Sequence, residues 1–98
     1  QNMYKHIFMW KFNLNTSVEE KEMMVDLLNS LVNKIKFLKK IEVALNSSDN
    51  KSAYDIVLTT EFNSEEDYKK YAKNKDHIKV VEFIKDIVSD RTVVDYTI

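Results

Sequence analysis

The chain has 98 residues, of which 44% are hydrophobic and 32% are charged, with 15 basic and 16 acidic side chains. This length fits one core, so we predict that residues 1–98 form a single domain. The nearly balanced charge lacks the basic surface that nucleic-acid binding requires, and Arg91, the only arginine, argues against a phosphate clamp built from arginines. We therefore expect no nucleic-acid partner.

Glycine, proline and cysteine are all absent from the chain. Without glycine it cannot carry the dinucleotide-binding, P-loop or nucleophile-elbow motifs, which need glycine for tight turns or close backbone approach. Without cysteine it has no disulfide framework, which is consistent with a reducing, cytoplasmic location. The longest apolar run, residues 7–10, is far shorter than the ~20 residues of a membrane span, so we expect no membrane partner.

The first predicted strand, residues 3–12, is apolar at its centre on both faces. Two sets of side chains alternate along it: Tyr4, His6, Phe8, Trp10 and Phe12 on one face, and Lys5, Ile7, Met9 and Lys11 on the other. The helices predicted for the rest of the chain can cover only one face of a sheet. The second face of this strand therefore predicts a partner.

The next elements follow from capping and periodicity. Ser17 and Glu20 form a capping box that predicts the start of a helix, and an apolar stripe at three- and four-residue steps follows it. The stripe contains Met24, Leu27, Leu28, Leu31, Ile35 and Leu38. Two strands are then predicted, the first carrying Ile41, Val43 and Leu45, and the second carrying Tyr54, Ile56, Leu58, Thr60 and Phe62 on its apolar side.

The C-terminal third predicts two more helices and a strand. Ser64 and Asp67 cap a helix that bears Tyr68 and Tyr71, and a break at residues 74–76 leads into the next helix. The stripe of that helix contains His77, Val81, Ile84 and Val88. The last strand, residues 91–98, has Thr92, Val94, Tyr96 and Ile98 on one side and Val93, Asp95 and Thr97 on the other.

The order strand, helix, strand, strand, helices, strand predicts an α+β fold. It is the ferredoxin-like split β-α-β subunit, with a four-stranded antiparallel sheet and its helices on one face. On the open face we expect Ile7, Met9, Val57, Thr59 and Val93 at the centre and Lys5, Lys11, Glu61, Arg91 and Asp95 at the rim. An apolar centre with a charged rim is typical of an interface, so we predict a homodimer through the open sheet faces.

The two histidines, His6 and His77, are the clearest lead toward chemistry. His6 lies among aromatic residues, where its simplest role is that of a buried histidine bonded to a backbone carbonyl. His77 lies at the predicted start of a helix, whose dipole lowers its pKa and favours a neutral ring that can accept a proton. Its simpler role is that of a first-turn residue partly in solvent. Tyr71 can offer a phenolic hydroxyl or merely pack in the core.

The sequence contains no evident set of metal ligands. It lacks cysteine and has two histidines only, and metal binding would need carboxylates that no spacing identifies. The carboxylates Asp55, Asp90 and Asp95 are most simply residues of strand edges and turns. We therefore expect no metal site and no cofactor.

The predicted elements together resemble the stress-responsive α/β-barrel family, known as the Dabb domain, over nearly the whole chain. The residues that carry the resemblance are Lys5, His6, Ile7, Phe8 and Phe12, then Tyr54, Asp55, Glu61 and Phe62, then His77, Val81, Phe83, Ile84, Val88, Asp90, Arg91, Val94, Asp95 and Tyr96. The usual His-Pro-x-His of the family is here Asn74, Lys75, Asp76 and His77, so its first histidine and its proline are missing.

The resemblance implies a dimeric α+β barrel, in agreement with the periodicity. It also implies a likeness to a plant polyketide cyclase of this fold, whose tyrosine and histidine match Tyr71 and His77. A strand-one pocket histidine of that enzyme matches His6, whereas its strand-three pocket histidine corresponds to Ile56. The polar lining of the pocket is therefore smaller in this chain.

We predict a small homodimeric protein with an apolar pocket that binds a small hydrophobic or aromatic molecule. The candidate catalytic residues are His77 as general base, Tyr71 as a carbonyl-polarising group and His6 as an orienting group, and the sequence leaves open whether the protein is an enzyme. The pocket lining is expected to include Phe8, Trp10, Met24, Leu28, Ile56, Leu58 and Val81. The alternatives are a haem-degrading or cofactor-free monooxygenase, a polyketide-cyclase-like enzyme, and a purely structural or interaction protein.

Overall fold

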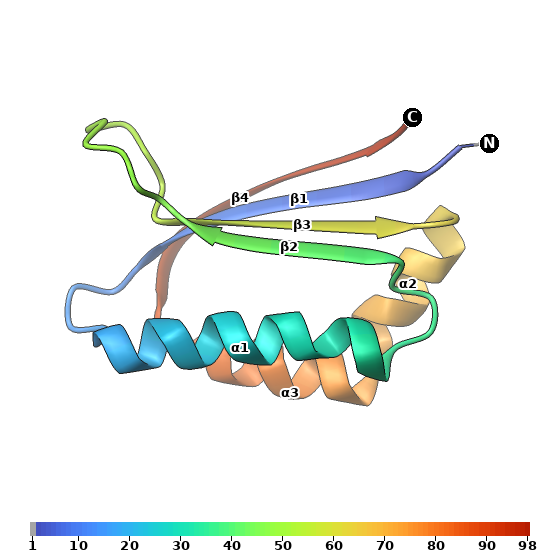
Figure 1. The fold of residues 1–98 in the computed structure, drawn as a ribbon, viewed down its shortest axis with the longest axis horizontal. Coiled ribbons are helices and arrows are strands. Elements are labelled where there is room, and N and C mark those ends of the chain that lie inside the picture. The colour runs from blue at the N-terminus through green and yellow to red at the C-terminus, as the bar shows by residue number, and fades with distance from the viewer. Residues whose placement is uncertain (1) are drawn as a thin grey trace.

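The computed structural model describes residues 2–98, which form a sheet covered by helices. The elements are β1 (Tyr4–Phe12), α1 (Val18–Lys34), β2 (Lys40–Leu45), β3 (Ile56–Phe62), α2 (Glu65–Lys73), α3 (Lys75–Ile84) and β4 (Val88–Thr97). The strands pair antiparallel in the order β2-β3-β1-β4, and the helices lie on one face of the sheet (Figure 1). The predicted ferredoxin-like α+β arrangement is confirmed.

The helices begin where the capping residues predict. The Ser17 hydroxyl accepts a hydrogen bond from the Glu20 backbone N–H, and the Glu20 carboxylate accepts one from the Ser17 N–H, which completes the capping box. At the start of α2, the Ser64 hydroxyl accepts a hydrogen bond from the Asp67 backbone N–H. The break between α2 and α3 is shorter than predicted. Asn74 alone ends one helix and caps the next through its side-chain oxygen, because that oxygen satisfies a free N–H of the first turn.

The core lies between the sheet and the helices. It is formed by the face of β1 that carries Tyr4, His6, Trp10 and Phe12, by the face of β3 that carries Ile56, Leu58, Thr60 and Phe62, and by Met24, Leu28 and Leu31 of α1. The alternation predicted for both central strands is therefore confirmed. Each of these strands is packed on one face by helices, so its residues divide cleanly by burial.

The predicted stripe of α3 is wrong in part. Val80 is its buried valine, with 5% of its surface exposed, whereas Val81 is 41% exposed. Val88 does not belong to the helix at all, because α3 ends at Ile84 and a turn closed by the Ile87 N–H on the Ile84 carbonyl leads directly into β4. The helical period cannot be continued across that turn.

The faces assigned to β4 are also wrong, and the strand begins at Val88 rather than at residue 91. Asp95 lies opposite His6 and Val93 lies opposite Phe8 in the antiparallel ladder, so both share the helix-side face of β1. Arg91, opposite Trp10, is on that face too. Since β4 is an edge strand whose residues are mostly exposed on both sides, its sequence carries no burial pattern that could fix the register.

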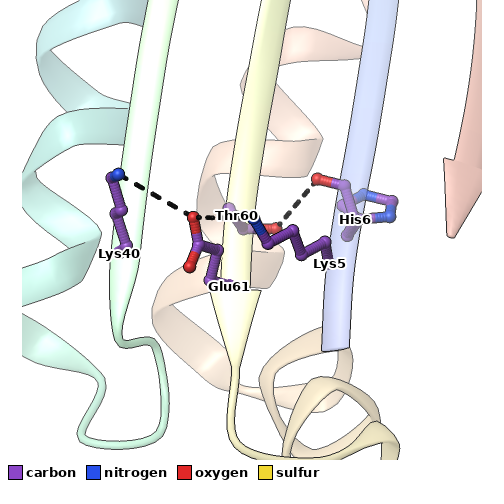
Figure 2. Close-up of polar contacts among 5 residues, drawn as sticks. All are labelled: Lys5, His6, Lys40, Thr60 and Glu61. Atoms are coloured by element: carbon purple, nitrogen blue, oxygen red, sulfur yellow. Dashed lines mark hydrogen bonds and ion pairs between the residues drawn. The ribbon is translucent and has the colours of Figure 1, made fainter. Parts of the chain in front are cut away.

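No helix formed by residues 2–98 covers the open face of the sheet (Figure 1). Ile7 and Met9 lie there beside Val57 and Thr59 as predicted, but the β4 residue opposite Ile7 is Val94 rather than Val93. At one end of this face, Glu61 Oε2 lies 3.8 Å from Lys5 Nζ and 3.9 Å from Lys40 Nζ, linking three neighbouring strands (Figure 2). The open face thus has an apolar centre and a charged end.

Candidate functional site

A cavity of about 160 Å³ lies between the sheet and the helices. It is lined by His6, Phe8, Trp10, Leu28, Leu58, Tyr68, Tyr71, His77, Val80, Val81, Ile84, Lys85, Val88 and Arg91. An engineered apolar cavity of about 150 Å³ in another protein holds a benzene molecule, so this volume suits a single aromatic ring. Most of its lining is apolar, with imidazole and phenol groups among it.

His6 enters the cavity lining from the central strand β1, and its ring is fixed by a carboxylate. Its Nδ1 lies 2.5 Å from Asp95 Oδ1. Because a carboxylate oxygen accepts hydrogen bonds, Nδ1 is the donor, and the other ring nitrogen, Nε2, takes no part in this bond. The His6 backbone carbonyl accepts a hydrogen bond from Thr60 Oγ1 at 3.4 Å (Figure 2). The prediction that the His6 ring bonds to a backbone carbonyl is therefore wrong, because its partner is the side chain of Asp95.

His77 lies in the first turn of α3, where its Nδ1 donates to the Ala72 carbonyl at 3.2 Å. Burial lowers the pKa of His77 below its usual value, and the positive charge that His6 can carry lowers it further, while the bond to Ala72 opposes both. The ring is therefore mainly neutral at pH 7. With the hydrogen on Nδ1, the lone pair resides on Nε2, which can accept a proton or a hydrogen bond.

A row of rings connects the two histidines along the cavity. The ring centroids of His6 and Tyr68 are 4.9 Å apart, those of Tyr68 and Tyr71 are 6.4 Å apart, and those of Tyr71 and His77 are 4.2 Å apart. Burial raises the pKa of Tyr71, so its hydroxyl keeps its proton at neutral pH. Two buried donors, the Tyr71 hydroxyl and the Trp10 indole N–H, have no hydrogen-bond partner within residues 2–98.

The sequence-predicted site residues divide into two groups. His6, Tyr71 and His77 share the cavity lining with Phe8, Trp10, Leu28, Leu58 and Val81. Met24 and Ile56 do not line it, because both are enclosed in the packed core. The cavity therefore lies toward α2, α3 and β4 rather than at the centre of the core.

Several lining residues were not anticipated. Tyr68 shares a helix face with Tyr71, and this spacing could have identified it. Arg91 reaches the cavity from β4, and Asp95 reaches His6 from the same strand. Neither could be identified locally, since both depend on the register of an edge strand.

Residues 2–98 form neither a metal-binding cluster nor a helix suited to a membrane. No three His, Cys, Asp or Glu side chains in this range gather closely enough to hold a metal ion. No helix in the same range is both long and apolar enough to cross a membrane.

Comparison with known proteins gives a family and a set of structural relatives. The family model described as the Stress responsive A/B Barrel Domain, Dabb, matches residues 4–98. A dimeric protein of unknown function and ferredoxin-like fold from Bacteroides fragilis is 31% identical, with a TM-score of 0.86, covering 98% of this chain and 96% of that chain. Comparison with curated proteins finds no match.

Two further solved structures are similar in fold. A dimeric ferredoxin-like protein of unknown function from Thermobifida fusca has a TM-score of 0.91 at 20% identity, covering 99% of this chain and 92% of that chain. A hydroxynitrile lyase from Passiflora edulis has a TM-score of 0.89 at 13% identity, covering 98% of this chain and 93% of that chain. At these identities the likeness shows the fold alone.

Proposed function

Because this chain belongs to the stress-responsive α/β-barrel (Dabb) family, we propose that it is a small homodimeric binding protein that takes up a small aromatic or hydrophobic molecule between its sheet and helices. The observation that carries the proposal is the cavity of about 160 Å³, whose lining combines apolar side chains with imidazole and phenol rings. Apolar concave sites with few polar groups are the usual form of small-molecule sites.

The two unpartnered donors support the same proposal. Burying a donor without an acceptor costs about 1–3 kcal/mol, and both the Trp10 indole and the Tyr71 phenol belong to the cavity lining. Neither donor atom is exposed to the cavity, so a ligand would reach them only with a small movement of the surrounding rings. A molecule with an oxygen acceptor on an aromatic ring would satisfy one of them.

Calorimetric titration with 3-phenylpropionamide, a neutral aromatic probe, tests the proposed site. Val81 lines the cavity from α3 and is 41% exposed, so Val81→Trp places a bulky group over the cavity with little harm to the core. Ile78 lies on the same helix, is 45% exposed and does not line the cavity, so Ile78→Trp is the matched control. We expect saturable binding that Val81→Trp abolishes and Ile78→Trp preserves. Equal binding by both variants, or none by the original chain, would contradict the proposal.

A second candidate function is proton abstraction from a bound carbonyl compound, with His77 as general base. The specific observation in its favour is that His77 is mainly neutral, with Nδ1 bonded to Ala72 and its lone pair on Nε2. In that step the C–H bond next to the carbonyl breaks, its proton passes to Nε2, and the electron pair moves into an enolate. Tyr71, which keeps its phenolic proton, could then donate to the enolate oxygen.

Deuterium exchange into phenylacetone in heavy water, followed by proton NMR, tests this second function. We expect the protein to accelerate exchange at the methylene next to the carbonyl, and His77→Gln to remove the acceleration. Lys79→Gln, on the same helix but not on the cavity lining, is the control. Acceleration that persists in His77→Gln would exclude His77 as the base.

The proposed dimer joins two open sheet faces. Ile7, Met9 and Val57 lie on a face that no helix of the described range covers, and the Bacteroides fragilis and Thermobifida fusca relatives are described as dimeric. An isologous contact through this face would cover the apolar centre of both copies at once.

The monooxygenase alternative and the cytoplasmic location stay predictions. A Soret shift on adding haemin would favour the monooxygenase alternative.

A further inference from the structure

The permanently charged side chains that line the cavity are of one sign. They are Lys85 and Arg91, which lie there with the imidazole rings of His6 and His77, and among residues 2–98 no carboxylate belongs to the lining. A concave site bordered by one sign of charge concentrates molecules of the opposite sign, because its low-dielectric walls focus the field. The cavity is therefore suited to a molecule that carries negative charge at one end.

Of the two permanently charged side chains in the lining, Arg91 is the one without an ion-pair partner among residues 2–98. Lys85 Nζ lies 2.5 Å from Glu82 Oε2, so its ammonium group has a partner. Within residues 2–98 no carboxylate forms an ion pair with Arg91. The neighbouring Asp90 carboxylate accepts from the Arg91 backbone N–H and from the Tyr54 hydroxyl, not from the guanidinium. An adjoining hollow that Arg91 also lines contains one carboxylate, Asp95, which is bonded to His6.

The position of Arg91 follows from the sheet register. Arg91 lies opposite Trp10 on β1, so it shares the helix-side face that bounds the cavity, yet it is exposed to solvent. A ring in the cavity would touch Trp10, Leu28 and Leu58, and a substituent that leaves the cavity beside β4 would meet the guanidinium. An arginine binds a carboxylate through two parallel hydrogen bonds, which gives orientation as well as attraction.

We infer that the ligand is a small organic anion, an aromatic ring bearing a carboxylate, whose ring occupies the cavity and whose carboxylate binds Arg91 at its solvent end. This inference rests on the proposed function, because it names the class of molecule that the same cavity takes. The volume of about 160 Å³ limits the buried part to about one ring, so the charged group must lie outside it.

The affinities of the full chain for 3-phenylpropionate and for its neutral amide, measured in parallel, test the inference. Both probes have the same ring and chain length, so their difference isolates the charge. We expect the carboxylate to bind about tenfold more tightly than the amide at low salt, and Arg91→Gln to reduce that preference to about twofold or less. Lys79→Gln removes the same charge from a position that is not on the cavity lining, and it should keep the preference.

The outcomes distinguish a failure of this inference from a failure of the proposed function. If the amide binds as tightly as the carboxylate, the cavity is a binding site but the anion preference is wrong. If Arg91→Gln and Lys79→Gln weaken carboxylate binding equally, the attraction is general and the assignment to Arg91 is overturned. If neither probe binds, the proposed function fails together with the inference. Loss confined to Arg91→Gln and to the carboxylate supports it.

Discussion

The two faces of strand β1 differ in how fully the chain covers them. On the helix side, Trp10 is 1% exposed and fully packed, while on the other side Met9 is only partly covered within the subunit. The first face is packed within the chain itself, whereas the apolar side chains of the second would be covered in the proposed dimer. Because adjacent residues of the strand lie on opposite faces, mutations can test folding and the proposed assembly separately.

The largest expected effect is on the helix side. Trp10→Ala should lower the free energy of unfolding by about 3–5 kcal/mol, because it removes a large buried side chain and enlarges the cavity. Val94→Ala, on the open face and 58% exposed, should cost about 1 kcal/mol or less. Urea unfolding of both variants measures the difference. Equal losses would contradict the contrast between the two faces.

The next effect concerns the open face. Met9→Asp should raise the dissociation constant of the proposed dimer by about 100-fold, because two carboxylates would be desolvated close to a two-fold axis. Leu14→Asp introduces the same charge in a fully exposed loop and should leave the dimer intact. Light scattering distinguishes a particle of 11.6 kDa from one of twice that mass. A monomer in the unmodified chain at micromolar concentration would refute the dimer.

A smaller effect is expected where the helix-side face meets the edge strand. Asp95→Asn should lower the free energy of unfolding by about 1–2 kcal/mol, because it weakens the charge-assisted bond to the largely buried His6 ring. Asp90→Asn, on the same strand but exposed, should cost less than about 0.5 kcal/mol. Urea unfolding at pH 7 measures both variants, and indistinguishable losses would show that the bond from His6 to Asp95 adds no stability.

The smallest expected effect is a pH dependence carried by His77. The pKa of His77 is lowered by burial in the folded protein, so below the usual histidine pKa of 6.5 the unfolded chain binds a proton more readily than the folded chain does. The contribution of His77 to stability is therefore complete above pH 6.5 and is lost as the pH falls toward the folded pKa. Melting temperatures from pH 7.5 to pH 5 should fall less steeply in His77→Gln. An NMR titration that gives His77 a pKa above 7 would contradict this.

The central strands could be predicted from sequence because burial imposes a period on them. Each of β1 and β3 has one face under the helices, so the alternation of apolar residues indicates which face is buried. This alternation includes Phe8 and Trp10 in β1, and Ile56 and Leu58 in β3. The helix caps at Ser17 and Ser64 were equally readable, since each depends on a hydrogen bond a few residues away. Local chemistry and one-sided burial together give the ferredoxin-like order of elements.

The edge of the site could not be predicted for the opposite reason. Most residues of β4 are exposed on both faces of the strand, so burial does not show whether Val93 or Val94 lies on the helix side. The pairing of β4 with β1 also shifts register between Lys11 and Phe12. Arg91 and Asp95 therefore approach the cavity and His6 only through long-range pairing. By contrast, His6 and His77 were found because a titratable ring on an apolar stripe is conspicuous in the sequence.

The most direct test of the proposed binding site uses the single tryptophan of the chain. Trp10 lines the cavity, its indole N–H has no partner among residues 2–98, and it gives one indole signal in an amide correlation spectrum of ¹⁵N-labelled protein. Titration with 3-phenylpropionamide should shift that signal saturably, together with the backbone signals of α3. An indole signal that stays unchanged up to millimolar probe, while only exposed residues shift, would show that the cavity is not a binding site.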